Sequence, residues 1–188
     1  MSYMFNYCND LIELDVSNFN TSNVQSMDSM FCECRSLKEI DTSGFNTENV
    51  ISMNYMFDNC VSLKKLDVSN FKTRKVRGMT HIFAYCEELL SLDVSRFDTS
   101  NIDNFDKMFT NCRKVPVLDV SKFDTSKAIS MSGTFDSCDS ITSLDLSGFK
   151  TSLVRDMSGL FNHCVSLKSL NLKSFATSNT ENMYGMFS

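Results

Sequence analysis

The stretch MFDNCVSLKKLDVSNF at residues 56–71 recurs along the chain with the same residue types in the same order. Its Leu66 belongs to a set of apolar residues with a constant spacing of 26. The set is Leu14, Ile40, Leu66, Leu92, Leu118, Leu144 and Leu170. A fixed period of roughly 20–50 residues is typical of repeat proteins, in which each unit stacks on its neighbours. The sequence therefore predicts a single solenoid over residues 1–188, with about seven 26-residue coils.

The same period explains the composition, which includes 16 Phe and 12 Met but no Trp. We call a set of residues spaced by 26 a column. One column is Phe19, Phe45, Phe71, Phe97, Phe123, Phe149 and Phe175. A second is Phe5, Phe31, Phe57, Phe83, Phe109, Phe135, Phe161 and Phe187. Because equivalent residues of stacked coils lie above one another, these columns predict ladders of buried rings.

Within one coil the sequence predicts three local structures. In LIELDVS at residues 11–17, Leu14 and Val16 alternate with Asp15, which predicts a short parallel strand stacked into one or two long sheets. The polar residues 17–23 predict a turn. Met27, Met30, Phe31 and Cys34 are spaced i, i+3, i+4 and i+7, which predicts one short helix or 3₁₀ turn per coil.

These repeated residues resemble a known family. MFDNCVSLKKLDVSNF and MFTNCRKVPVLDVSKFDTS at 108–126 are similar to the 26-residue repeat of bacterial surface proteins, which is related to the BspA-like leucine-rich repeats of surface proteins and lipoproteins. The resemblance implies a leucine-rich-repeat-like solenoid, a cell-surface or secreted location, and a role in adhesion or ligand binding. It supplies no functional residues. Departures such as Thr42 and Leu146 in the Val16 column leave the predicted fold unchanged.

The cysteines form another column. It comprises Cys8, Cys34, Cys60, Cys86, Cys112, Cys138 and Cys164. Stacking at ~5 Å would allow disulfides, but an odd number cannot pair completely, and a straight ladder does not provide a tetrahedral zinc site. We therefore expect a buried stack of reduced thiols. Cys32 lies outside the column, and we expect it to be exposed and the one candidate reactive thiol.

Two polar columns have alternative interpretations. Asp15, Asp41, Asp67, Asp93, Asp119 and Asp145 could hold calcium, or each could accept hydrogen bonds from the backbone of its own turn. The second interpretation is favoured, because calcium-binding solenoids supply several oxygen ligands per turn. The Thr21 column suggests ice binding, but bonding within the polar turn explains it better.

Charge and motifs exclude several classes of function. The net charge of −5 lacks the basic footprint of a nucleic-acid-binding protein. No apolar run is long enough to span a membrane, and no signal peptide is visible. No common catalytic motif occurs, and His81 and His163 belong to different columns several coils apart. We expect no enzymatic activity and no cofactor.

A candidate binding face lies where the coils differ. The two positions between the strand leucines vary most and should project outward. From these positions we select Glu13, Glu39, Lys65, Leu90, Pro116, Val117 and Lys168. The apolar centre of this face suggests a patch for an unknown protein or surface ligand, whereas drift at unconstrained surface positions is the alternative.

The ends of the repeat suggest a second function. Neither end carries a polar capping unit, so the solenoid is predicted to be uncapped at both ends. Uncapped coils expose ladder edges and tend to associate. The alternative to an adhesive or ligand-binding segment is therefore a structural spacer or a filament built by end-to-end stacking.

Overall fold

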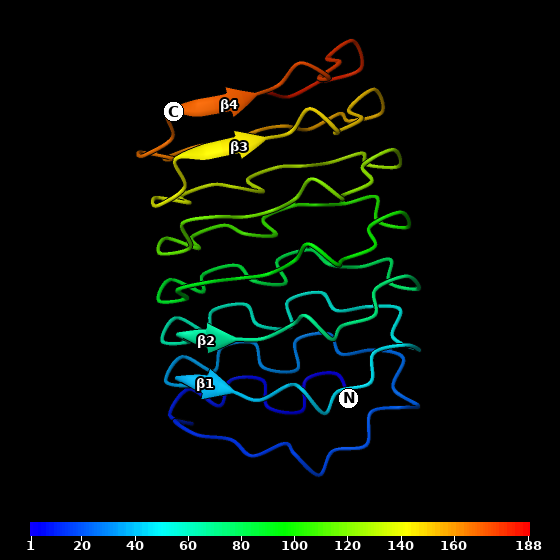
Figure 1. The fold of residues 1–188 in the computed structure, drawn as a ribbon, viewed down its shortest axis with the longest axis vertical. Helices are drawn as coiled ribbons and strands as arrows, with labels where there is room; N and C mark the ends of the chain where they lie inside the picture. The colour runs from blue at the N-terminus through cyan, green and yellow to red at the C-terminus, as the bar shows by residue number, and fades with distance from the viewer.

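The structure is a computed structural model that describes all residues 1–188, and the chain winds through successive stacked coils (Figure 1). Coils are counted from Leu11, so that coil 1 spans 11–36 and each later coil begins 26 residues further on. The strands are β1 Glu39–Ile40, β2 Lys65–Leu66, β3 Ser143–Asp145 and β4 Ser169–Asn171. The pairs β1–β2 and β3–β4 are parallel, with each residue opposite its equivalent in the next coil. The predicted short parallel strands and their register are confirmed.

Regular strand pairing does not extend into a long sheet, so the expected long sheets are wrong. The two sheets have two strands each and lie on either side of coils 4 and 5. The Lys64 amide donates to the Lys38 carbonyl at 2.9 Å, and the Leu90 amide continues this ladder to Lys64 at 3.3 Å. The next position is Pro116, which has no N–H to donate. One proline therefore interrupts the ladder near its centre.

The predicted helix in each coil is also wrong, because the structure contains no helix. The backbone amides of Met27, Ser29 and Phe31 donate to carbonyls of coil 2 at 2.8–2.9 Å. Those amides are unavailable for bonds to the fourth residue before them, which an α-helix requires. Residues 27–34 form successive tight turns instead, with Met30 bonded to Met27 and Cys34 to Phe31. Isolated parallel bridges such as Ser26↔Ser52 precede these turns.

Left-handed residues make these turns possible. Ser29 has a φ of 52° and Glu33 a φ of 64°, and the same two columns have positive φ in the other coils. A positive φ at the third residue of a turn fits a type II turn, where glycine is favoured. Gly133 and Gly159 occupy the Ser29 column in coils 5 and 6, each with a φ of 60°. The apolar spacing that predicted a helix is therefore produced by a chain of turns.

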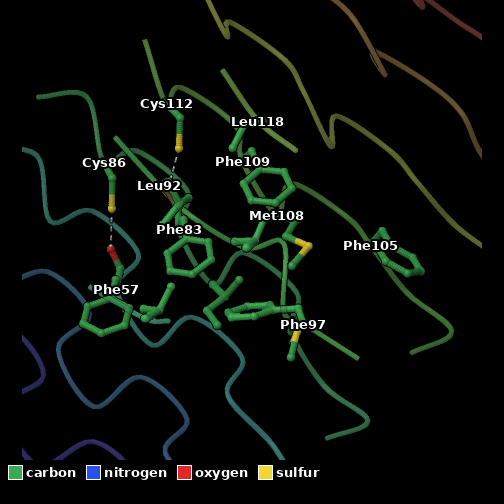
Figure 2. Close-up of a cluster of buried hydrophobic side chains, with 14 of the residues drawn as sticks. Phe57, Phe83, Cys86, Leu92, Phe97, Phe105, Met108, Phe109, Cys112 and Leu118 are labelled. Atoms are coloured by element: carbon green, nitrogen blue, oxygen red, sulfur yellow. Dashed lines mark hydrogen bonds between the residues drawn. The ribbon is translucent and has the colours of Figure 1, made fainter. Parts of the chain in front are cut away.

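The interior is filled by the predicted columns. Stacked rings run from Phe5 to Phe187, with neighbouring centroids 5.4–6.0 Å apart. Figure 2 shows Phe57, Phe83 and Phe109 in this stack. The ladder residues Cys34, Cys60, Cys86, Cys112, Cys138, Phe45, Phe71, Phe97 and Phe123 are all buried. This core bears out the column alignment and leaves the variable side chains on the surface.

Buried threonine hydroxyls join neighbouring coils. Thr99 Oγ1 donates to the Asp124 carbonyl at 3.1 Å and accepts from the Asp124 amide at 2.8 Å. The same pair of hydrogen bonds to the residue 25 positions ahead is made by Thr21, Thr47, Thr73, Thr125 and Thr151. The expected bonding within the turn is thus replaced by bonding between coils. Each hydroxyl satisfies a donor and an acceptor that would otherwise be unpaired.

Candidate functional site

The candidate binding face has the predicted orientation at every selected position. Glu13, Glu39, Lys65, Leu90, Pro116, Val117 and Lys168 are all exposed. Strand alternation explains this, because Ile40 and Leu66 turn inward beside Glu39 and Lys65. Leu90 is 55% exposed and Val117 is 69% exposed. The central coils therefore present apolar side chains to solvent.

The structure brings only some of these residues together. Glu13, Glu39 and Lys65 line one shallow hollow of about 580 Å³, in which Lys65 Nζ lies 3.9 Å from Glu39 Oε2. Pro116 and Val117 line a second hollow of about 400 Å³ together with Ser91. Neither Leu90 nor Lys168 lines either hollow, and Lys168 is two coils beyond Pro116.

Carboxylates of the Asp15 column line the same two hollows. Asp67 accepts a hydrogen bond from the Ser69 amide at 2.9 Å, and equivalent bonds occur from Asp15 to Asp145. These bonds to the serine two residues ahead lower the pKa of Asp67 and of its column neighbours. The predicted role in local backbone bonding is confirmed. The face is therefore anionic at neutral pH, with an apolar centre.

The thiol ladder is reduced and hydrogen-bonded. All eight cysteines are free. Cys86 Sγ donates to the Phe57 carbonyl and Cys112 Sγ to the Phe83 carbonyl, each at 3.3 Å, as Figure 2 shows. Burial raises the pKa of both thiols well above its ordinary value. The ladder is thus a structural element whose thiols stay protonated.

Cys32, the one candidate reactive thiol, is not exposed as we expected. It is partly buried, and its Sγ lies 3.8 Å from Asp58 Oδ2 in the next coil. Burial raises the pKa of Cys32 to about 12, with the nearby carboxylates of Asp58 and Glu33 adding to the effect. Thiolates rather than thiols are nucleophilic, so this position disfavours reactivity.

Asp58 and His81 form a second polar cluster beside Cys32. Asp58 is buried, and its Oδ1 lies 3.9 Å from His81 Nδ1 and has no hydrogen-bond partner. Burial raises the pKa of Asp58 to about 6. Burial also lowers the pKa of His81, with Lys107 contributing. Both groups therefore shift toward their neutral forms, and no permanent ion pair holds them together.

The largest hollow lies elsewhere and was missed by the sequence analysis. It measures about 990 Å³ and is lined by the polar turns of coils 2, 3 and 4. Its cations are Lys72, Arg74, Lys75 and Arg77, from the single segment KTRKVR. The signal was present in the sequence, since coil 1 has NTSNVQ at the same columns.

Comparison with known proteins places the chain in a family. A family model described as "Mycoplasma protein of unknown function, DUF285" matches residues 1–116 and again residues 86–188. The chain belongs to the DUF285 family. The two overlapping matches agree with the internal repetition of a DUF285 sequence. No curated protein and no solved structure matches this DUF285 chain.

The structure of this DUF285 protein has no helix long and apolar enough to cross a membrane. Its repeated coils carry two kinds of surface site: the anionic strand face with its apolar centre, and the basic hollow at the turns. The two sites share no lining residue.

Proposed function

We propose that this chain is a non-enzymatic, leucine-rich-repeat-like solenoid of a bacterial cell-surface protein, and that it binds a protein through its strand face. The surface location and the relation to BspA-like proteins are inferred from the repeat resemblance. The observation that supports binding is the exposed apolar centre, where Leu90 and Val117 stand in columns that carry charged residues in earlier coils. Exposed apolar residues rimmed by polar ones are a common feature of interaction sites.

The partner's chemistry is suggested by the surrounding charges. Asp67, Asp93 and Asp119 line the hollow beside Pro116 and Val117. A partner segment with an apolar side chain flanked by lysine or arginine would complement this arrangement. A regular, extended face is also the surface through which other solenoids bind proteins.

A binding role without catalysis is supported by the state of the nucleophilic and basic groups. Burial keeps the pKa of the ladder thiols high, and His81 has its pKa lowered in a partly buried cluster. His163 lies in coil 6, with Asp136 Oδ1 at 4.0 Å as its ionic neighbour. Neither histidine has a bonded nucleophile of the kind that acyl-transfer catalysis uses.

Site-specific crosslinking tests this proposal. A photoreactive amino acid at position 117 should give a discrete adduct with a protein from the host-cell surface. The same residue placed at Ser147, exposed outside the hollow, should not. With the photoreactive residue kept at position 117, Leu90→Lys combined with Pro116→Thr uses residues that other coils carry in this column, and it should abolish the adduct. An adduct that survives this double substitution would contradict the proposal.

A further inference from the structure

The four cations of the basic hollow are not neutralised by neighbouring carboxylates. Lys72, Arg74, Lys75 and Arg77 are exposed, and none takes part in an ion pair within 4.0 Å. Lys75 Nζ donates to Asn49 Oδ1 at 2.9 Å, which leaves its charge unbalanced.

Equivalent cations in another coil are paired. In coil 6, Lys150 occupies the Lys72 column and lies 3.8 Å from Asp124, and Arg155 occupies the Arg77 column and lies 3.9 Å from Glu181. In these two columns the unpaired state is thus a property of coil 3.

The backbone that carries the cations is held firmly. The Lys72 amide donates to Thr47 Oγ1 at 2.6 Å, and the Arg77 amide donates to the Ile51 carbonyl at 2.9 Å. Between them, Thr73 and Val76 are buried and joined by a 2.9 Å backbone bond. The four charged side chains therefore project from a turn that is fixed at both ends, which reduces the entropy lost when a ligand is bound.

The lining of the hollow combines cations with neutral polar groups. The lining includes four neutral polar side chains, which are Ser43, Asn46, Asn70 and Asn101. Glu48 is the one acidic residue of the lining. Of the nearby acids in coil 4, Asp98 accepts hydrogen bonds from the Ser100 amide and hydroxyl, and both Asp98 and Asp103 lie outside the lining. The hollow therefore offers a net positive surface with amide and hydroxyl groups beside the charges.

We propose that this hollow binds a sulfated polysaccharide. Sulfate groups would pair with the lysine and arginine side chains, and sugar hydroxyls would exchange hydrogen bonds with the exposed side chains of Ser43 and Asn46. The volume of about 990 Å³ suits a short oligosaccharide segment. This site is separate from the proposed protein-binding face, because the two have no lining residue in common.

Two features favour a polysaccharide over nucleic acid. Proteins that bind single strands stack bases on exposed aromatic rings, whereas the only ring in this lining is Phe45, which is buried. Nucleic-acid-binding proteins carry their lysines and arginines along a stripe or a broad basic face, whereas these four cations are confined to one hollow. A local cluster of four cations is suited to a few sulfates on a flexible sugar chain.

The test uses dextran sulfate and neutral dextran of the same length, with the whole protein. Dextran sulfate should bind with an affinity that falls as salt rises, and dextran should not bind. The variant Lys72→Asn, Arg74→Ser, Lys75→Asn, Arg77→Gln carries the coil 1 residues of these columns. It should weaken dextran sulfate binding at least about tenfold, because it removes all four cations that would pair with sulfate groups. The control Lys150→Asn, Arg155→Gln should stay within about twofold of the unchanged protein.

A second measurement needs no substitution. Bound dextran sulfate should protect Lys72 and Lys75 from acetylation in the unchanged protein more than it protects Lys150. Equal binding by the fourfold variant, equal protection of all three lysines, or tighter binding to a DNA duplex than to dextran sulfate would each overturn the assignment. Loss of crosslinking at position 117 would bear only on the strand face, so the two proposals fail separately.

Discussion

The chemistry of individual thiols is set by contacts between coils. Cys32 faces Asp58 of the next coil, and burial raises its pKa to about 12. We predict that iodoacetamide at pH 8 alkylates Cys32 at least about tenfold more slowly in the folded protein than in urea, because little thiolate is present. Peptide mass spectrometry over time measures both rates. Equal rates in the two conditions would show that Cys32 is free to react.

Asp58 should make stability depend on pH. Its pKa is about 6 in the folded protein against an ordinary value of 3.8, so folding favours the protonated acid. The resulting stability is fully present below about pH 4 and is lost as the pH rises through about 6. Asp58→Asn, which keeps the shape without the charge, should therefore raise the melting temperature more at pH 7 than at pH 4.

A matched control exists in the same column. Asp136 is more exposed than Asp58, with 25% against 12% of the side chain accessible, and has His163 as its neighbour. Asp136→Asn makes the same substitution at this less buried position, and its effect on the melting temperature at pH 4 and pH 7 provides the control. The stability that depends on His81 changes with pH in the opposite direction, because folding lowers the pKa of this histidine. The prediction therefore concerns the difference in melting temperature between the Asp58→Asn variant and the unchanged protein at each pH. A pH-independent effect of Asp58→Asn would contradict the prediction.

At the level of the coil, threonine bridges hold neighbouring turns together. Thr99→Val keeps the volume but leaves the amide and the carbonyl of Asp124 without their partner. At ~1–3 kcal/mol for each unsatisfied buried group, we expect at least about 2 kcal/mol of lost stability in urea unfolding. Thr99→Ser retains the hydroxyl and should therefore keep most of the stability that Thr99→Val loses. Thr177 is exposed and makes no such bond, so Thr177→Val should have little effect, and an equal loss at both threonines would refute the bridging role.

The elements of a coil were predictable only in part from the sequence. The Leu14 column correctly predicted the position of the strands and their parallel register, because both follow from which residues are buried. The helix expected at Met27–Cys34 failed because apolar spacing does not reveal where backbone amides bond. The left-handed residues Ser29 and Glu33 are not glycines, so local propensity conceals the turns. Gly133 and Gly159 were the available hint.

At the scale of the molecule, one candidate site was predictable from the sequence and the other was not. Leu90 and Val117 were found because the strand alternation fixes which side chains face outward. The basic hollow was missed because it requires three coils side by side, with Asn46, Lys72 and Asn101 far apart in sequence. The sequence does contain the signal, because KTRKVR carries more cations than the same turn columns of any other coil. Whether charges are paired across coils, as Lys150 and Asp124 are, depends on side-chain positions that a sequence does not give.

The whole molecule should behave as a chain of units coupled only to their neighbours. Phe83 is fully buried and stacks between Phe57 and Phe109, with both centroid distances 6.0 Å. Phe83→Ala should cost about 3–5 kcal/mol, and this loss falls on the interfaces that connect coils 2, 3 and 4. We therefore expect the single urea transition to broaden or split, with hydrogen exchange showing coils 5 and 6 protected after coils 1 and 2 have opened. Phe187→Ala is the control, since that ring is 62% exposed and has one stacking neighbour. A Phe83→Ala transition that shifts to lower urea with an unchanged slope would mean that the coils unfold as one unit.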